Sequence, residues 1–487
     1  MAIKRYFSNA DTTITNAYQE DLVTRGTGSN MGAADILEIF QIYGQVSGAS
    51  GLESELSRVL IKFPVSDIIT DRTAGTVPGA GSVNFYLRLY NAEHTKTTPS
   101  NFTLSVLPVS ADWEEGIGMD MENYSDVTSG YLGSNWIQSA GSTAWSSTGG
   151  DYHASPESTV SFASGLENIE VDVTTLVEQW IAGTKSNYGF GIKLSSTDEE
   201  STTSVYTKKF FSRTSQFFHK RPTLEARWNS VRSDQRGDFY ISSSMLPASE
   251  NMNDLYLYNV VRGQLQDIPS IGTDPIYVNI YETLGEEHTT LTEYTPATGS
   301  HVSTGIYKVS ICTTSSAATL YDVWFSSSVT QTDAITSTQF HTGTITPQTY
   351  SALNQQTSTE YLLNITNLRD EYNRAETARF RLYVRPKNWS PNVYTTAVST
   401  PESVIIPTAS YEVCREIDNF KVIPFGTGSL KHTGLSYDVN GSYFDLSMNM
   451  FEAGYSYKIK FAFYDPSAGS YVQQPNEFKF RVREDVY

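Results

Sequence analysis

Cysteine is almost absent from this chain: Cys312 and Cys414 are the two among its 487 residues. A long chain with so few thiols is not a small secreted scaffold held together by disulfides, because such scaffolds are dense in cysteine. The two side chains could form one bridge, but the low count favours buried free thiols.

Basic residues are also scarce. The 34 Lys and Arg face 53 Asp and Glu, which gives a formal net charge of −19. A large nucleic-acid or anionic-membrane footprint needs clustered basic side chains, so this balance argues against both partners. Local basic patches could still form around 208–209 and 219–221.

Long apolar runs are missing. No stretch approaches the roughly 18 apolar residues of a membrane helix, and the first residues, MAIKRYFSN, lack the apolar region of a signal peptide. We therefore expect a chain made in the cytoplasm without a leader.

Catalytic motifs are missing as well. There is no G-x-S-x-G turn, phosphate-binding loop or dinucleotide fingerprint, and the seven His show neither H-x-H nor H-E-x-x-H spacing. The sequence thus predicts no enzyme, no catalytic residue and no cofactor.

What the chain does contain is aromatic and β-branched sequence in period-2 alternation. It has 31 Tyr and 23 Phe, residue types that suit half-buried sheet surfaces. Alternation predicts strands at 58–65, 82–90, 102–109, 223–228, 277–281, 307–311, 378–384, 456–464 and 477–482. Because amphipathic helices do not separate these strands, the pattern indicates antiparallel, all-β sandwiches.

Helical signal is sparse. The segment 172–182 spaces Leu176, Val177, Trp180 and Ile181 at helical intervals, and Asp172 or Thr174 is the expected N-cap. We predict one short helix there, across a sandwich end. The stretch 52–57 fits either a helical turn or a loop.

Breaks in the pattern predict three regions. The first is 1–228, and a polar stretch at 229–238 looks like a linker. The second region is 229–346 and the third is 347–487, which could hold two units with a break near 400.

An acidic run follows Trp113. Glu114, Asp120 and Glu122 are its weak candidates for a calcium site, because hard cations collect carboxylates and carbonyls. The segment 198–200 is a second candidate. Neither contains a calcium-loop motif, so solvated acidic loops are the plainer interpretation. Adjacent strand residues such as Glu114 and Glu115 face opposite sides and cannot form a catalytic acid–base pair.

Three aromatic residues, Trp136, Trp145 and Tyr152, lie in a Gly/Ser-rich insertion at 119–154. We expect such a loop to expose the rings, which could then stack on glycan rings or anchor a protein interface, where Trp and Tyr are favoured. Trp113, Trp180 and Trp228 lie on predicted core elements and are expected to pack.

Elements of the first region occur in a recognisable order. They are 10–14 (ADTTI), 30–32 (NMG), 36–39 (ILEI), 58–63 (RVLIKF), 112–116 (DWEEG), 171–174 (VDVT), 180–183 (WIAG), 187–189 (NYG) and 221–224 (RPTL). In this order they resemble the DNRLRE-type domain of bacterial surface proteins and polysaccharide-degrading enzymes, variants of which occur in predicted phage virion proteins. The resemblance implies a jelly-roll β-sandwich over 1–228, in which the Trp-Glu-Glu element is structural.

The remainder is similar to Ig-like modules of phage structural proteins, through 364–368, 378–384, 455–464 and 478–482. The two resemblances together imply a virion component: an adaptor of the neck, baseplate or tail fibre that contacts other virion proteins and copies of itself. A carbohydrate-binding module of a surface or fibre protein and a capsid decoration protein are the alternatives.

Overall fold

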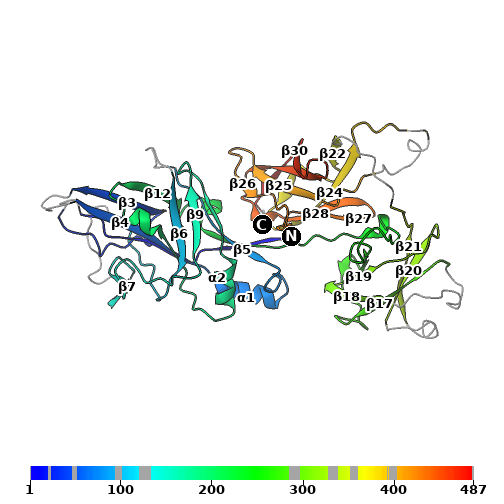
Figure 1. The fold of residues 1–487 in the computed structure, drawn as a ribbon, viewed down its shortest axis with the longest axis horizontal. Coiled ribbons are helices and arrows are strands. Elements are labelled where there is room, and N and C mark those ends of the chain that lie inside the picture. The colour runs from blue at the N-terminus through cyan, green and yellow to red at the C-terminus, as the bar shows by residue number, and fades with distance from the viewer. Residues whose placement is uncertain are drawn as a thin grey trace. The chain divides into compact units, whose positions relative to one another are not determined.

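The computed structural model describes residues 2–19, 23–45, 52–93, 101–119, 133–283, 297–326, 338–350, 360–391, 393 and 403–484. Contacts divide the chain into two compact units: Met1–Asn229 with Asn449–Glu452, and Ser230–Met448 with Ala453–Tyr487. Both consist mainly of antiparallel sheets, as the ribbon in Figure 1 shows. The predicted all-β fold of several sandwich domains is confirmed.

The first unit pairs a four-stranded sheet with a seven-stranded one. The smaller has the order β1 (Ile3–Phe7), β13 (Thr223–Arg227), β5 (Asn84–Leu89), β10 (Ile169–Asp172). The larger runs β12 (Val205–Phe211), β3 (Ile36–Gln45), β4 (Leu52–Lys62), β11 (Phe190–Leu194), β6 (Phe102–Pro108), β9 (Ser158–Phe162), with β2 (Ala10–Thr15) also paired to β4. A short hairpin joins β7 (Gln138–Ala140) and β8 (Thr143–Ala144).

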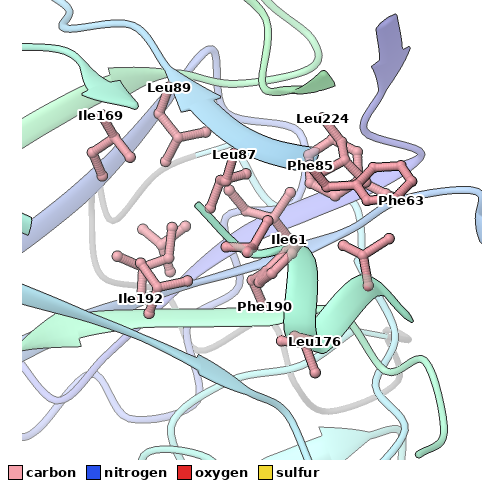
Figure 2. Close-up of a cluster of buried hydrophobic side chains, with 14 of the residues drawn as sticks. Ile61, Phe63, Phe85, Leu87, Leu89, Ile169, Leu176, Phe190, Ile192 and Leu224 are labelled. Atoms are coloured by element: carbon pink, nitrogen blue, oxygen red, sulfur yellow. The ribbon is translucent and has the colours of Figure 1, made fainter. Parts of the chain in front are cut away.

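The main core of this unit lies between the two sheets. Side chains alternate along each strand, so Val59 and Ile61 of β4 and Leu87 of β5 point into the same cluster. Figure 2 shows Ile61, Leu87 and Phe190 converging from different strands. Leu60 points to the opposite face of its sheet, where it belongs to a separate buried cluster.

Among its described residues the first unit has three α-helices: α1 (Val65–Thr73), α2 (Thr174–Ile181) and the single turn α3 (Ser196–Glu199). The predicted helix is confirmed as α2, which buries Leu176, Val177 and Trp180. Its N-cap is Val173, so the predicted polar cap is wrong. The Thr174 hydroxyl instead accepts the Phe85 N–H at 2.8 Å, which ties the helix to β5.

The segment 52–57, expected to be a helical turn or a loop, is the first half of strand β4 and pairs with β3. Leu56 lies opposite Gln41, and Leu52 lies opposite Gln45. All nine strands that alternation predicted are present, as β4, β5, β6, β13, β17, β19, β24, β29 and β30. The first was predicted to reach residue 65, but β4 ends at Lys62 and Val65 begins helix α1.

The second unit begins with a six-stranded sheet: β14 (Asn253–Tyr258), β19 (Ile306–Ile311), β18 (Ala297–Ser303), β17 (Ile276–Tyr281), β20 (Leu320–Phe325), β21 (Gln339–Ile345). Strand β18 pairs first with β17 and then, after Gly299, with β19. A Cβ at Gly299 would lie 2.8 Å from the Lys308 carbonyl oxygen and 2.9 Å from the Ile276 side chain. Glycine therefore permits the close packing at this change of partner.

Two further large sheets lie in the described part of this unit. One has the order β22 (Tyr361–Ile365), β24 (Thr377–Pro386), β28 (Gly441–Ser447), β27 (Ser436–Asp438). The other runs β23 (Glu371–Asn373), β30 (Ser470–Arg483), β29 (Ser456–Asp465), β25 (Ala409–Arg415), β26 (Lys421–Ile423). Phe444 of the first sheet stacks on Tyr411 of the second, with ring centroids 4.2 Å apart. Short 3₁₀ turns are η2 (Phe218–Lys220), η3 (Gln235–Gly237) and η4 (Met448–Met450).

The stretch 229–238, expected to be a linker, includes residues folded into the second unit. Asp234 is buried, and its N–H donates to the Tyr437 carbonyl oxygen at 3.0 Å. Arg236 forms a two-pronged ion pair with the fully buried Asp322, with one contact of 2.8 Å. Its polar composition reflects these buried pairings rather than solvation.

Both cysteines carry free thiols. Cys414 is buried, as expected, but Cys312 is exposed, which contradicts the expectation of two buried thiols. Cys312 follows the last residue of β19. Within the described part of the chain, no helix has the length and apolar character needed to cross a membrane.

Candidate functional site

The aromatic insertion forms a second core on the outer face of the seven-stranded sheet. Leu60 points away from the main core and meets Trp113, Trp136 and Trp145 in a separate buried cluster. The described part of the insertion, from residue 133 onward, thus covers one sheet face. The sandwich therefore has a third packed layer here, which the Gly/Ser-rich sequence of the insertion did not indicate.

Burial corrects the expectation that these aromatic rings are exposed. Trp136 and Trp145 are each 6% exposed, and Trp145 Nε1 donates to the Asn135 carbonyl oxygen at 2.9 Å. Tyr152 is half-buried and its hydroxyl donates to the Gly149 carbonyl oxygen. Burial raises the pKa of Tyr152 to about 12. The two Trp rings are packing residues and offer no open face to a sugar or a protein. The predicted packing residues Trp113 and Trp180 are buried as expected.

Arg58 fastens the insertion to the sheet. Its Nε and Nη2 donate to the Glu199 carboxylate at 2.9 and 2.8 Å, and its Nη1 donates to the Gly149 carbonyl oxygen at 2.8 Å. Its guanidinium lies 5.1 Å from the Trp136 ring, within cation–π range. Glu199, in the second candidate calcium segment, therefore serves as the partner of an arginine.

A second set of hydrogen bonds that holds the insertion centres on Asn30. Its Nδ2 donates to the carbonyl oxygens of Glu115 and Ser134, both at 2.8 Å, while its Oδ1 accepts the N–H groups of Gly32 and Gly118. A Cβ at Gly118 would lie 1.8 Å from the Asn30 carbonyl oxygen. Glycine is required here because the backbone approaches the asparagine so closely.

The acidic run does not form a metal centre in the described residues. Glu114 is exposed, and Asp120 and Glu122 lie outside the described residues. Glu115 accepts the Asp11 N–H at 2.8 Å and pairs with Arg213. No group of three His, Cys, Asp or Glu that could hold a metal ion occurs among the residues that the structure describes.

Asp11, beside this pair, is the most perturbed carboxyl group of the region. Burial raises the pKa of Asp11 to about 7, and the nearby Glu115 acts in the same direction. The Arg213 N–H donates to Asp11 Oδ2 at 2.7 Å. These contacts join the start of the chain to the Trp-Glu-Glu element and to the segment after β12, so the carboxylates here have structural partners.

The basic patches also differ from what the sequence indicated. Lys208 is 1% exposed and Lys209 is half-buried, pairing with Glu38 at 3.3 Å. Lys220 lies over the rings of Phe211 and Phe217, 4.9 and 5.5 Å from their centroids. Charge spacing alone could not distinguish a buried lysine from an exposed one.

The second unit exposes an apolar hairpin that sequence reasoning missed. Strands β15 (Val260–Val261) and β16 (Gln264–Leu265) are joined by Arg262 and Gly263, whose φ angles are 52° and 82°. Positive φ at both positions characterises the type I′ turn, which fits the twist of a hairpin. Val260 is 56% exposed, and Val261 and Leu265 are each 41% exposed.

Hydrogen bonds fix the base of this hairpin. The Gln266 N–H donates to the Asn259 carbonyl oxygen at 3.1 Å, and Asn259 Nδ2 donates to the Gln266 carbonyl oxygen at 2.7 Å. The Asn259 N–H donates to Gly305 in the neighbouring turn at 2.8 Å. The hairpin is therefore anchored to the rest of its unit. The two adjacent valines were the signal in the sequence from which an exposed apolar hairpin could have been predicted.

No family model and no curated protein matches the chain. Fibronectin(III)-like modules of Clostridium thermocellum CbhA are 10% identical to it, over 53% of this chain and 92% of that chain, with a TM-score of 0.15. The native alpha-2-macroglobulin of E. coli is 8% identical over 99% of this chain and 26% of that one, also with a TM-score of 0.15. A TM-score this low adds nothing to what the sheets themselves establish. The chain is a multi-domain β-sandwich protein, and the DNRLRE resemblance stays a prediction.

Proposed function

We propose that this chain is a structural component of a bacteriophage virion, in which its β-sandwich modules act as adaptors that assemble through protein contacts. The observation that carries the assembly role is the β15–β16 hairpin, with Val260, Val261 and Leu265 turned to solvent. Val260 and Leu265 are partners across the hairpin and face the same side, and neighbouring exposed aliphatic side chains of this kind are typical of interaction surfaces.

The hairpin also suits binding because its conformation is fixed before a partner binds. The two-residue turn at Arg262 and Gly263 and the hydrogen bonds of Asn259 hold it in one conformation. A preorganised element loses less conformational freedom when a partner covers it. In a symmetric particle, many such modest contacts would add through avidity.

The virion part of the proposal rests on the resemblance of residues 1–228 to a module also present in predicted phage virion proteins. A position in the neck, baseplate or tail fibre accords with a string of sandwich modules better than capsid decoration does. The partners would be other virion proteins and further copies of the chain.

Mass spectrometry of purified particles tests the proposal. The chain should be present at a fixed copy ratio to the major virion proteins. Val260→Asp should reduce its incorporation by roughly tenfold, the effect of losing about 1.4 kcal/mol of contact free energy. Val472→Asp is the matched control, because Val472 is 43% exposed on β30, which belongs to a different sheet from the hairpin.

Each part of the proposal can fail separately. Absence of the chain from purified particles would overturn the virion assignment. Normal incorporation of the Val260→Asp chain would instead show that the hairpin is not the assembly contact.

A further inference from the structure

A lysine is enclosed within the first unit. Lys208 of the edge strand β12 is 1% exposed, and its Nζ donates to Asn91 Oδ1 at 2.7 Å. It also donates to the carbonyl oxygens of Gly165 at 2.9 Å and Glu167 at 2.7 Å. The amine is thus held in contact with a side-chain carboxamide and two main-chain groups.

Aromatic rings line the same enclosure. Lys208 Nζ lies 4.9 Å from the centroid of Phe162 and 5.3 Å from that of Phe210. Burial lowers the pKa of Lys208 to about 8, although the charge of Glu167 opposes this shift. A desolvated lysine with a lowered pKa has a larger neutral fraction near neutral pH, and the neutral amine is a nucleophile.

The carboxamide is held close to this amine. The Asn91 carbonyl carbon lies one C=O bond, about 1.2 Å, beyond its oxygen, and so within about 4 Å of the nitrogen. Reacting atoms in a near-attack arrangement are about 3–3.5 Å apart, so a small rotation of the carboxamide would bring the two together. The Ala92 N–H donates to the Lys209 carbonyl oxygen at 2.9 Å, which fixes the backbone of the two segments.

We propose that Lys208 and Asn91 form an intramolecular isopeptide bond. The Lys208 Nζ–Asn91 Cγ bond forms and the Asn91 Cγ–Nδ2 bond breaks. When Lys208 enters as an ammonium, two of its protons pass to the leaving nitrogen, which departs as ammonium. The step is a transamidation, so nothing is oxidised or reduced and no co-reactant is needed.

The bond would join two distant parts of the chain. Asn91 follows β5 of the four-stranded sheet, and Lys208 lies on the edge of the seven-stranded sheet, 117 positions later in the sequence. A covalent link that closes so long a loop restricts the unfolded chain strongly, in the way a disulfide does. Such a covalent cross-link would suit a module that bears mechanical load.

The intact mass of the purified full chain, followed by peptide mapping, tests the proposal. The chain should be lighter than its sequence requires by one ammonia, and the peptides that contain Asn91 and Lys208 should be recovered linked to each other. Lys208→Met and Asn91→Ala should each abolish the mass loss and the linked peptides, whereas Lys209→Met should keep both. Asn91→Asp should restore the link with loss of one water instead.

The outcomes separate the bond from its alternatives. Succinimide formation at an asparagine also releases ammonia, but it leaves the two peptides unlinked and would overturn the proposal. Full mass after prolonged incubation above pH 8 would overturn the proposal, because Lys208 would then only donate hydrogen bonds to its three acceptors. If Lys208→Met fails to fold, the Asn91→Asp chain decides, because it retains the lysine and an acceptor oxygen.

Discussion

Buried charge is concentrated around Glu225 in the four-stranded sheet. Its carboxylate accepts Arg5 Nε at 2.7 Å, Arg88 Nη1 at 2.6 Å and Arg227 Nε at 2.8 Å. Burial alone would raise the pKa of Glu225, but the surrounding guanidinium groups hold it well below its usual range. The carboxylate is therefore the common partner that makes burial of these arginines tolerable.

Replacing this carboxylate should be costly. Glu225→Gln keeps the shape but removes the charge, and breaking a buried charge network in this way destabilises proteins by about 3–5 kcal/mol. We expect a loss of that size in the free energy of unfolding of the first unit, measured by urea denaturation followed by circular dichroism.

An exposed ion pair provides the control. Glu360 pairs with Lys387 at 2.6 Å, with side chains 71% and 62% exposed. Glu360→Gln should leave the free energy of unfolding almost unchanged, because water screens an exposed ion pair. Equal losses for the two variants would mean that burial of Glu225 does not set the energy of its network.

At the scale of elements, the sequence predicted the strands better than the segments that pack on the sheets. Alternation located β4 because Val59 and Ile61 face one side and Leu60 the other. Helix α1 was missed because Val65–Thr73 is rich in β-branched residues, which have low helix propensity, and it buries only Val65 and Ile68. An element that becomes helical through tertiary packing leaves a weak local pattern.

The candidate site was less predictable for a related reason. Gly and Ser around Trp136 and Trp145 indicated an exposed loop, but their burial depends on an outer sheet face that no local pattern reveals. Likewise, Glu199 lies in a segment that was a candidate calcium site, but the fold pairs it with Arg58. Long-range pairing decides such roles, and spacing along the chain does not record it.

The covering layer should depend on Asn30. Asn30→Ala removes four hydrogen bonds, each worth about 0.5–1.5 kcal/mol net. We expect the insertion to detach from the sheet while the main core stays folded. A red shift of tryptophan fluorescence and faster proteolysis between residues 112 and 152 would report this.

Asn367→Ala serves as the control. Asn367 also makes side-chain hydrogen bonds, to Arg379 and Arg381, but in the second unit. It should leave proteolysis of the insertion unchanged. If Asn30→Ala does the same, the Trp cluster alone is sufficient to hold the covering layer.

At the scale of the molecule, the two compact units have separate cores. One cluster of the first unit contains Ile61 and Phe190, and one cluster of the second contains Val278 and Trp324. Chains whose parts have cores of their own commonly unfold in more than one transition.

Calorimetry can resolve these transitions and assign them. Ile61 and Val278 are both 0% exposed, so Ile61→Ala and Val278→Ala should cost about 2–5 and 1–3 kcal/mol respectively through lost burial and cavity formation. We expect each substitution to lower a different transition temperature and to leave the other within error. A single transition lowered by both variants would mean that the two cores unfold as one cooperative system, because each substitution would then destabilise the whole chain.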